Sequence, residues 1–499
     1  MKRFSAGFIL LLALLFIYQN SASQDLGRFP VVNFHHREYA GHSQSWAITQ
    51  DKRGLIYVAN NVGVIEYDGN EWRQISVNGA LSRCLDVDET GRVWVGGQDE
   101  FGYLAADSSN NLKFYSIANN LPELYRSTGL IRQVYCTKSG TFFSANGLLI
   151  RVASDLSVKV WTPKSIFHRS YYVENVLLIN QKDIGLSYLS GDSLKVIPGG
   201  EFFGKELIYT ILPFDNQHLI IGTQSDGFYL LNRKVFELGY NPKDSAPLIT
   251  KFITDDDLFF KENWIYSGLR LDNGILAIGT YRGGVLFINE KGQTVRRINR
   301  SVGLQDDAVW YLFMDDQDNL WMALNNGISY TSTYSQLTGW NETDGINGVL
   351  QSVVRYDGDI YVSSNIGVFR KSKGVFEKIG GISDLSWKLK VVQDAQGEEL
   401  LLVATSSGIY QVKGNSAHLI EHGLVHSYSF SQSIVYPNIV YVGMRDGVGV
   451  LMNNRGVCKF LGKLEGTSGE VYSIQENPDG DLWYSERYKG VRFVDIINP

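Results

Sequence analysis

Apolar and polar positions along this chain follow a unit that returns many times. Residues 310–332, WYLFMDDQDNLWMALNNGISYTS, contain three apolar runs separated by an acidic turn and by a polar turn with glycine. Within each run the apolar positions recur with a period of two, as in a half-buried β-strand. A short aromatic run follows in several copies, such as EWRQI from Glu71 and KVFEL from Lys234. Each unit therefore predicts four short antiparallel strands joined by tight turns.

The unit occurs eleven times, at intervals of about 40 to 45 residues, which is the spacing of propeller blades. A four-stranded sheet cannot bury both of its faces alone, but sheets packed side by side around an axis can. The sequence therefore predicts an all-β fold of β-propeller repeats. The copies begin near Trp46, Arg83, Arg132, Glu174, Tyr209, Tyr266, Trp310, Leu350, Leu389, Ser429 and Val471.

The copies divide into two predicted domains. Seven copies would form a seven-bladed propeller over residues 24–340, and GWNETDGING at 339–348 is the expected joint. Residues 341–499 supply four copies, the last of which stops after its third strand, and would form a partial second propeller. Such an arc cannot close alone and leaves an exposed edge strand, which could pair with a partner chain or with further sequence. We therefore expect a truncated product or fragment, or a secreted part that works through another protein.

The turns and the residues around them have a physical reading. An acidic turn residue can bond its own backbone, and the following glycine allows positive φ. The large residue of the second run, such as Trp94, is expected to face a neighbouring blade, and the small residue two positions later, such as Gly96, leaves room where blades converge. Turns such as DVDETG resemble calcium loops superficially, but they lack the glutamate that closes an EF-hand loop.

The first 23 residues have the pattern of a signal peptide. Lys2 and Arg3 precede a short apolar run at 7–18, and small residues at 21–23 offer a cleavage site. The apolar run is short for a membrane span, although an uncleaved anchor is the alternative. No later segment looks like a transmembrane helix. We expect a periplasmic or extracellular protein, exported through this N-terminal signal.

Composition excludes several other classes of site. The net charge of −6 is mild and no basic face stands out, which argues against a nucleic acid partner. The three cysteines have no zinc spacing, and His422 and His426, whose spacing could bind a metal on a helix, precede a predicted strand and lack the HExxH frame, so no metal and no cofactor is expected. The histidines that lie close enough in sequence to be candidate metal ligands are the cluster His35, His36 and His42 and the pair His422 and His426. The cysteines, Cys84, Cys136 and Cys458, are read as buried small apolar residues, with a Cys84–Cys136 bridge left open.

The repeat D-x-x-G-x-[LI]-[WY]-[VIM]-[AG]-[TN]-x-x-G-[VI] resembles the regulator-propeller repeat of bacterial two-component sensors. Residues 34–73 and 95–117 are especially similar to it, and the resemblance covers essentially the whole chain after residue 23. It implies extracellular propellers that sense breakdown products of polysaccharides. The resemblance also implies two seven-bladed propellers, a Tyr-rich immunoglobulin-like domain, a membrane helix, and a kinase or transcriptional regulator as output. This sequence departs from that pattern, since it contains only eleven blades.

A candidate ligand site follows from aligning the copies on their turns. The residue that begins each first strand should lie near one mouth of the central channel. Aromatic faces there would stack on a sugar, and guanidinium groups would pair with carboxylate or sulfate. Alternatively, these residues plug the channel or pack between blades. The predicted ring is Trp46, Arg83, Arg132, Glu174, Tyr209, Tyr266 (or Ser267, if a shorter turn shifts the register) and Trp310, and Tyr472 is the matching residue of the last copy.

No motif in the sequence names a reaction, since neither a nucleophile elbow nor a phosphate loop is present. We therefore expect a non-enzymatic, exported sensor propeller that binds a glycan-like, acidic oligosaccharide and signals through a membrane-bound kinase or transcriptional regulator. One alternative is a secreted propeller enzyme, a polysaccharide lyase or hydrolase, that uses a channel acid such as Glu174. The other is an interaction scaffold without a small ligand, and self-association through the open second propeller would provide a partner.

Overall fold

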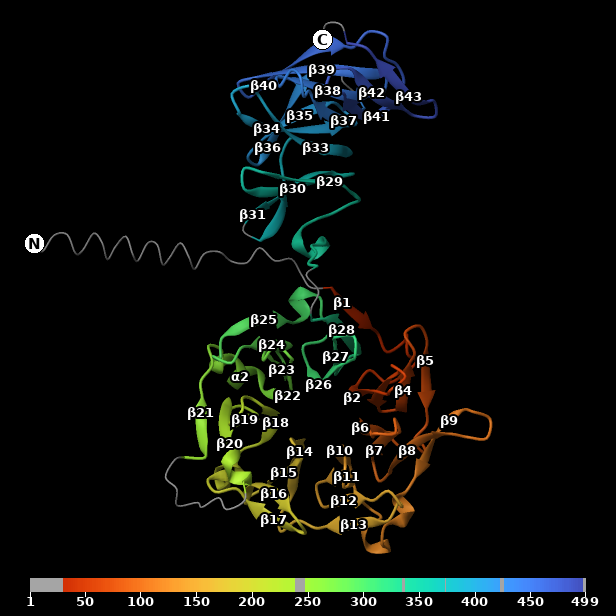
Figure 1. Ribbon diagram of the computed structural model, residues 1–499, viewed down its shortest axis with the longest axis vertical. Coiled ribbons are helices and arrows are strands. Elements are labelled where there is room, and N and C mark those ends of the chain that lie inside the picture. The colour runs from red at the N-terminus through yellow and green to blue at the C-terminus, as the bar shows by residue number, and fades with distance from the viewer. Residues whose placement is uncertain (1–29, 238–246, 334–336, 373, 422–425, 497–499) are drawn as a thin grey trace, which may run out of the picture. The chain divides into compact units, whose positions relative to one another are not determined.

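The computed structural model describes residues 30–237, 247–333, 337–372, 374–421 and 426–496. The predicted signal peptide and His422 lie outside these ranges. The described chain folds almost wholly into antiparallel β-sheets, which confirms the all-β propeller fold predicted from the repeat. It separates into two compact units, one within residues 28–338 and the other within residues 339–499 (Figure 1).

The first unit contains seven four-stranded sheets among the described residues. In chain order, the first three are β2 (Ser45–Gln50), β3 (Ile56–Asn60), β4 (Gly63–Tyr67) and β5 (Trp72–Ile75); β6 (Ser82–Val87), β7 (Val93–Gly97), β8 (Phe101–Ala106) and β9 (Leu112–Ser116); and β10 (Ile131–Thr137), β11 (Gly140–Ala145), β12 (Leu149–Val152) and β13 (Val158–Trp161).

The next three sheets of this unit have the same topology. They are β14 (Phe167–Val173), β15 (Val176–Gln181), β16 (Gly185–Ser190) and β17 (Ser193–Val196); β18 (Ile208–Pro213), β19 (His218–Thr223), β20 (Phe228–Asn232) and β21 (Ile249–Phe252); and β22 (Ile265–Arg270), β23 (Leu276–Thr280), β24 (Val285–Ile288) and β25 (Thr294–Ile298). The seventh sheet combines β26 (Val309–Met314), β27 (Asn319–Leu324) and β28 (Ile328–Ser332) with β1 (Val31–Phe34).

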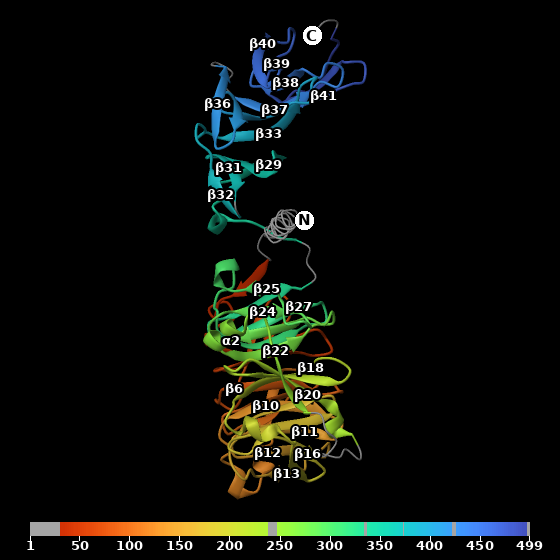
Figure 2. The ribbon, with the colours of Figure 1, turned by 90° about the vertical axis from the view of Figure 1, so that its left-hand side faces the viewer.

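The seven sheets close into a ring. Strands β2, β6, β10, β14, β18, β22 and β26 each contact the next one in this order, and β26 contacts β2 in turn. Figure 1 shows these strands around the centre of the unit. In Figure 2, which shows the unit from the side, it is thinner than it is wide. The seventh sheet gains its outer strand from the start of the described chain, since β1 pairs with β28 from Val31 opposite Thr331 to Phe34 opposite Ile328. Both ends of this unit are thereby joined in one sheet.

The acidic turns hold their hairpins through a carboxylate, as predicted. In the second sheet the backbone N–H groups of Thr90 and Arg92 donate to Asp88 Oδ1 at 2.9 and 3.1 Å, and Trp94 Nε1 donates to Asp88 Oδ2 at 2.8 Å. Asp315 and Trp321 repeat this arrangement in the seventh sheet. The oxygens of these carboxylates therefore bind N–H groups of the hairpin. Within the described ranges, no group of three or more His, Cys, Asp and Glu side chains could hold a metal ion.

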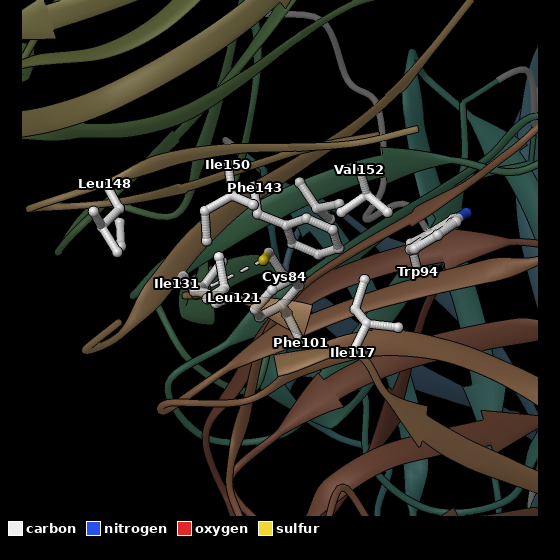
Figure 3. Packing of buried hydrophobic residues seen from close by; sticks show 12 residues of the cluster. Cys84, Trp94, Phe101, Ile117, Leu121, Ile131, Phe143, Leu148, Ile150 and Val152 are labelled. Atoms are coloured by element: carbon white, nitrogen blue, oxygen red, sulfur yellow. Dashed lines mark hydrogen bonds between the residues drawn. The ribbon is translucent and has the colours of Figure 1, made fainter. Parts of the chain in front are cut away.

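Apolar side chains fill the space between adjacent sheets (Figure 3). Between the second and third sheets, Cys84 lies in a cluster with Phe101, Ile131 and Phe143. A Cβ atom added to Gly96 would lie 2.7 Å from both Cys84 Sγ and Ile131 Cγ2, which explains the small residue predicted at this position. The prediction that the cysteines are buried apolar residues is confirmed for Cys84 and Cys458, whereas Cys136 is half-buried. All three are free thiols, so no Cys84–Cys136 bridge forms.

The second unit contains three four-stranded sheets and one three-stranded sheet among the described residues. Their innermost strands contact one another in the order β29, β33, β37 and β41. The strands are β29 (Leu350–Tyr356), β30 (Asp359–Ser364), β31 (Gly367–Ser372) and β32 (Val375–Lys378); β33 (Ser386–Gln393), β34 (Glu399–Thr405), β35 (Ile409–Lys413) and β36 (Ser416–Glu421); β37 (Ser427–Gln432), β38 (Ile439–Met444), β39 (Gly447–Asn454) and β40 (Val457–Lys463); and β41 (Val471–Glu476), β42 (Leu482–Glu486) and β43 (Gly490–Val494).

Helical segments are short and lie between strands. They are α2 (Asp257–Asn263) and the 3-10 turns η1 (Ala118–Asn120), η2 (Glu123–Tyr125), η3 (Gly200–Gly204), η4 (Arg233–Phe236), η5 (Arg300–Val302) and η6 (Glu342–Asp344). Helix α2 buries Phe260 against Phe228, with 5.0 Å between the ring centroids. In the part of the chain that the structure describes, none of the helices has the length and apolar character needed to span a membrane.

Candidate functional site: the central cavity of the first unit

A β-bulge occurs at the same place in every innermost strand of the first unit. In the first sheet Ser45 pairs with Asn60 and Ala47 pairs with Ala59, so Trp46 is the extra, unpaired residue. A bulge of this kind bends the strand and re-aims a side chain. The seven bulged residues are Trp46, Arg83, Arg132, His168, Tyr209, Tyr266 and Trp310.

These bulges surround a cavity of about 230 Å³ in the centre of the ring. All seven innermost strands contribute to its wall, and six of the seven bulged residues line it. Arg169, Tyr135 and Tyr311 also line it, together with uncharged polar residues such as Gln133 and Ser170. Among the described residues that form this wall there is no Asp, Glu, Lys or His, so its formal charge comes from arginine alone.

The structure brings together six of the seven residues that the sequence proposed for the channel mouth, and leaves one apart. The register question at the sixth copy is settled in favour of Tyr266, because Ser267 pairs in register with Gly279. Tyr472 is the bulged residue of β41 and belongs to the second unit. The six residues that line the cavity are Trp46, Arg83, Arg132, Tyr209, Tyr266 and Trp310.

The placement of Glu174 at the channel mouth is wrong. The innermost strand of the fourth sheet is β14, which ends at Val173, so Glu174 lies in the turn towards β15. Its carboxylate forms an ion pair with Arg233, with 2.9 Å between Oε2 and Nη1, and it does not line the cavity. Glu174 and Asn175 both have positive φ, of 49° and 66°, so this hairpin turns through two left-handed residues and contains no glycine. The predicted start of this copy therefore coincides with the second strand of the sheet, β15, instead of the first, β14.

The aromatic bulged residues form a continuous arc on one side of the cavity. The ring centroids of Trp46 and Trp310 are 5.6 Å apart, those of Trp310 and Tyr266 are 4.6 Å apart, and those of Tyr266 and Tyr209 are 4.9 Å apart. His168 extends the arc at 5.6 Å from Tyr209. Each ring contacts the next, so the rings are fixed by one another.

Arg83 is held between the first and sixth sheets. Its guanidinium carbon lies 3.5 Å from the centroid of the Trp46 ring, and its Nη2 donates a hydrogen bond to Tyr266 Oη at 3.0 Å. Its Nη1 is buried and has no hydrogen-bond partner among the described residues. Burial is the main cause that lowers the pKa of Arg83, although the phenol of Tyr266 opposes this effect.

Arg169 is the functional residue that the sequence reasoning missed. It follows the bulge of β14, and its guanidinium lies 4.2 Å from the ring of Tyr209 and 4.6 Å from the ring of Tyr266. Its Nη1 donates to the carbonyl oxygen of Tyr266 at 3.3 Å. An arginine at the start of a strand, just before the polar–aromatic run SYY, was the available signal.

The arginines change the acidity of their neighbours. Burial alone would raise the pKa of Tyr266, but the charges of Arg169, Arg83 and Arg132 and the hydrogen bond from Arg83 together lower it below 10. For Tyr209, by contrast, burial prevails over Arg169 and raises the pKa. Burial and the charges of Arg169 and Arg132 lower the pKa of His168 to about 4, so its imidazole is neutral at pH 7.

An acid lies near the cavity, but its oxygens are bound to the backbone. The backbone N–H of Cys136 donates to Asp86 Oδ2 at 2.6 Å, and that of Val87 donates to Asp86 Oδ1 at 2.8 Å. Burial raises the pKa of Asp86, although these hydrogen bonds oppose the shift. The charge of Asp86 contributes to the raised pKa of Tyr311, after the larger effect of burial. Asp86 is thus a structural acid that joins the second and third sheets.

Comparison with solved structures shows what the chain is similar to. The extracellular domain assigned to the hybrid two-component system BT3049 of B. thetaiotaomicron has a TM-score of 0.62 and 19% sequence identity, over 93% of this chain and 65% of that one. The extracellular domain assigned to the one-component system BT4673 of B. thetaiotaomicron has a TM-score of 0.47 and 16% identity, over 94% and 66%. Virginiamycin B lyase from Staphylococcus aureus has a TM-score of 0.44 and 10% identity, over 61% and 99%.

Of these three structures, only the BT3049 domain has a TM-score above 0.5. No family model matches the sequence, and no curated protein matches it either. The chain spans 65% of the length of the BT3049 domain. At 19% identity the match shows a shared fold, and it agrees with the resemblance to two-component regulator propellers that the repeat indicated.

Proposed function

We propose that this chain is the ligand-binding part of an exported, non-enzymatic sensor, and that the central cavity of the first unit binds a glycan-like ligand. The observation that carries the proposal is the arc of contacting rings from Trp46 through Trp310 to Tyr209 beside the guanidinium groups of Arg83, Arg132 and Arg169. Aromatic faces stack on the apolar face of a sugar ring, while arginines bind its polar substituents.

The composition of the wall argues against the alternative of a polysaccharide-cleaving enzyme. Glycoside hydrolysis commonly uses a pair of carboxylates that flank the bond to be broken. The cavity wall has no carboxylate, Glu174 is paired with Arg233 elsewhere, and Asp86 is bound to backbone N–H groups. The described residues thus lack an acid–base pair at this site, which favours binding without turnover.

The signalling step of the proposal rests on the similarity to an extracellular domain of a two-component system. We expect ligand binding to be passed to a membrane-bound kinase or transcriptional regulator, either as another protein or as a further module. Self-association through the second unit is the alternative. Chemical cross-linking in membranes, with and without ligand, would identify a partner, and light scattering of the isolated chain would report self-association.

The binding step is tested by thermal-shift screening of the mature protein against a panel of oligosaccharides and monosaccharides. A ligand that binds the folded state raises Tm by mass action. We expect at least one saccharide to raise Tm in a saturable way, Trp310→Ala to weaken this response, and Glu174→Gln to leave it unchanged. Release of new reducing ends or unsaturated products from a polysaccharide would instead support the enzyme, and the lack of any saturable small ligand would support the scaffold.

A further inference from the structure

Among the described residues, no carboxylate pairs with the three arginines of the cavity. No ion pair of the described residues involves Arg83, Arg132 or Arg169, although ion pairs hold other arginines of the unit, such as Arg53 with Asp51. Charges gathered at one site without counter-charge repel one another, and this repulsion is stronger where water is partly excluded. An anion that enters the cavity would reduce this repulsion and so lower the free energy of the folded protein.

Each guanidinium also retains N–H donors for a ligand. An arginine has five N–H donors in a planar fork. Arg83 uses Nη2 towards Tyr266, while its Nη1 is buried without a partner. Arg169 uses Nη1 towards backbone carbonyl oxygens. N–H groups of these guanidinium groups therefore remain for a ligand, among them the buried Nη1 of Arg83.

The aromatic contacts fix the planes of two of these forks. Arg83 rests on the Trp46 ring, and Arg169 rests on the Tyr209 and Tyr266 rings. A guanidinium that is held by stacking has lost its rotational freedom before the ligand arrives, so binding does not have to order it. Carboxylate and sulfate oxygens match the spacing of such a fork and accept two parallel hydrogen bonds.

We propose that Arg83, Arg132 and Arg169 form an anion subsite that binds the carboxylate or sulfate group of an acidic sugar, whose ring stacks on the aromatic arc from Trp46 to Tyr209. This inference rests on the proposed glycan binding and adds the charge class of the ligand. The volume of about 230 Å³ is below the roughly 300 Å³ at which small-molecule sites in proteins usually start, so we expect no more than one sugar ring with its charged group to enter. A longer oligosaccharide would place only one residue in the cavity.

The test compares four probes on the mature protein by isothermal titration calorimetry at low salt. They are galacturonate, galactose 6-sulfate, neutral galactose and inorganic sulfate. We expect the two acidic sugars to bind at least tenfold more tightly than galactose. Arg169→Gln and Arg132→Gln should each weaken the acidic sugars roughly 10- to 100-fold, as the loss of a charged hydrogen bond does, while changing the affinity for galactose less than threefold.

Two of the variants serve as controls for misfolding and for the general loss of a positive charge. The side chain of Arg132 forms no hydrogen bond or ion pair with a described residue, so Arg132→Gln should fold even if Arg169→Gln does not. Arg233→Gln removes an arginine of the same propeller that pairs with Glu174 outside the cavity, and it should leave all four affinities unchanged. The Tm of each variant without ligand reports its folding.

The outcomes separate the two proposals. If galactose binds as tightly as the acidic sugars, or if both arginine variants retain full affinity for the acidic sugars, the anion subsite is refuted while glycan binding stands. If sulfate binds through these arginines and no sugar binds, the subsite takes free inorganic anions and the acidic-sugar assignment is refuted, while the wider saccharide panel again decides whether glycan binding stands. If none of the probes binds, the acidic-sugar assignment is refuted, and the wider saccharide panel decides whether glycan binding stands.

Discussion

Arg83 lies flat against Trp46, with its guanidinium carbon 3.5 Å from the centroid of the ring, and it reaches across the cavity to donate a hydrogen bond to Tyr266. A stacked cation of this kind is stabilised by about 1 to 2 kcal/mol where water is partly excluded. The contact joins residues of three different sheets, so the position of one arginine depends on the closure of the whole ring. We therefore expect the proposed ligand binding to depend on propeller integrity through this residue.

The acidity of Tyr266 reports this contact directly. Because Arg169, Arg83 and Arg132 together lower the pKa of its phenol below 10, Tyr266 should ionise before an ordinary tyrosine. The difference in absorbance at about 295 nm between the wild type and Tyr266→Phe, followed from pH 7 to 11, isolates this step. In the Arg83→Met background, the same difference should move to higher pH, because one charge and one hydrogen bond are lost. A step at or above pH 10 in the wild type would contradict the proposed electrostatics.

His168 should make stability depend on pH below neutrality. Its pKa is about 4 in the folded state and 6.5 as the usual value, so the unfolded chain takes up a proton in a range where the folded chain does not. Stability therefore falls as pH decreases from 6.5 towards 4 and is independent of this group above that window. By linkage, the loss at pH 4.5 is roughly 2 to 3 kcal/mol.

Denaturant unfolding at pH 7 and pH 4.5 measures this effect. His168→Asn should lose less stability between the two pH values than the wild type, by the amount stated above. The groups that face this imidazole are Arg169, Arg132, Asn180 and the ring of Tyr209, and of these only the arginines are charged in this range. Equal pH dependence of the wild type and the variant would show that His168 is not the titrating group.

Most of the seven bulged residues were predictable from the sequence. The tight turns align the copies, and the alignment identifies one equivalent residue at the start of each first strand. One bulged residue, His168, and one further residue of the cavity wall, Arg169, were missed for physical reasons. His168 was hidden because the turn at Glu174 and Asn175 uses two left-handed residues without glycine. Arg169 was missed because repeat periodicity does not show where a long side chain extends, and that side chain rests on rings of two other sheets.

The strand pairing that closes the ring was not predictable from the repeat, although the seven-bladed propeller itself was predicted. Strand β1 pairs with β28, close to 300 residues further along the chain, and a local apolar pattern does not specify so distant a partner. The same applies to Arg83, whose hydrogen-bond partner Tyr266 is 183 residues away. Periodicity defines the blade, whereas the contacts between blades depend on the closed geometry.

Asp88 should contribute to stability far more than its neighbour Glu89. Burial would raise the pKa of Asp88, but hydrogen bonds from Thr90, Trp94 and Arg92 together lower it below 3.8. Its stabilising effect is therefore present above about pH 4 and is lost as pH falls through the folded-state value. Asp88→Ala removes the acceptor of the half-buried Trp94 N–H and should cost about 2 to 4 kcal/mol in urea unfolding at pH 7.

Glu89→Ala is the matched control, since this side chain is exposed in the same turn and should change stability by less than about 0.5 kcal/mol. Addition of EDTA should leave the Tm of the wild type unchanged, because the Asp88 carboxylate binds N–H groups of its own hairpin. A fall of Tm on chelation, restored by calcium, would show that these turns bind metal instead.

Closure of the ring should depend on Phe34 at the end of β1. Its ring contacts four aromatic residues of the first and seventh sheets at centroid distances of 5.1 to 6.1 Å: Tyr67, Trp72, Trp321 and Tyr330. Phe34→Ala deletes these contacts and should destabilise the first unit by about 2 to 3 kcal/mol, because the side chain is half-buried. Val32→Ala, on the exposed side of the same strand, should cost less than about 1 kcal/mol, because little apolar surface is lost. Hydrogen exchange of the β28 amides locates the effect, and equal protection of β28 in the two variants would show that Phe34 does not hold the ring closed.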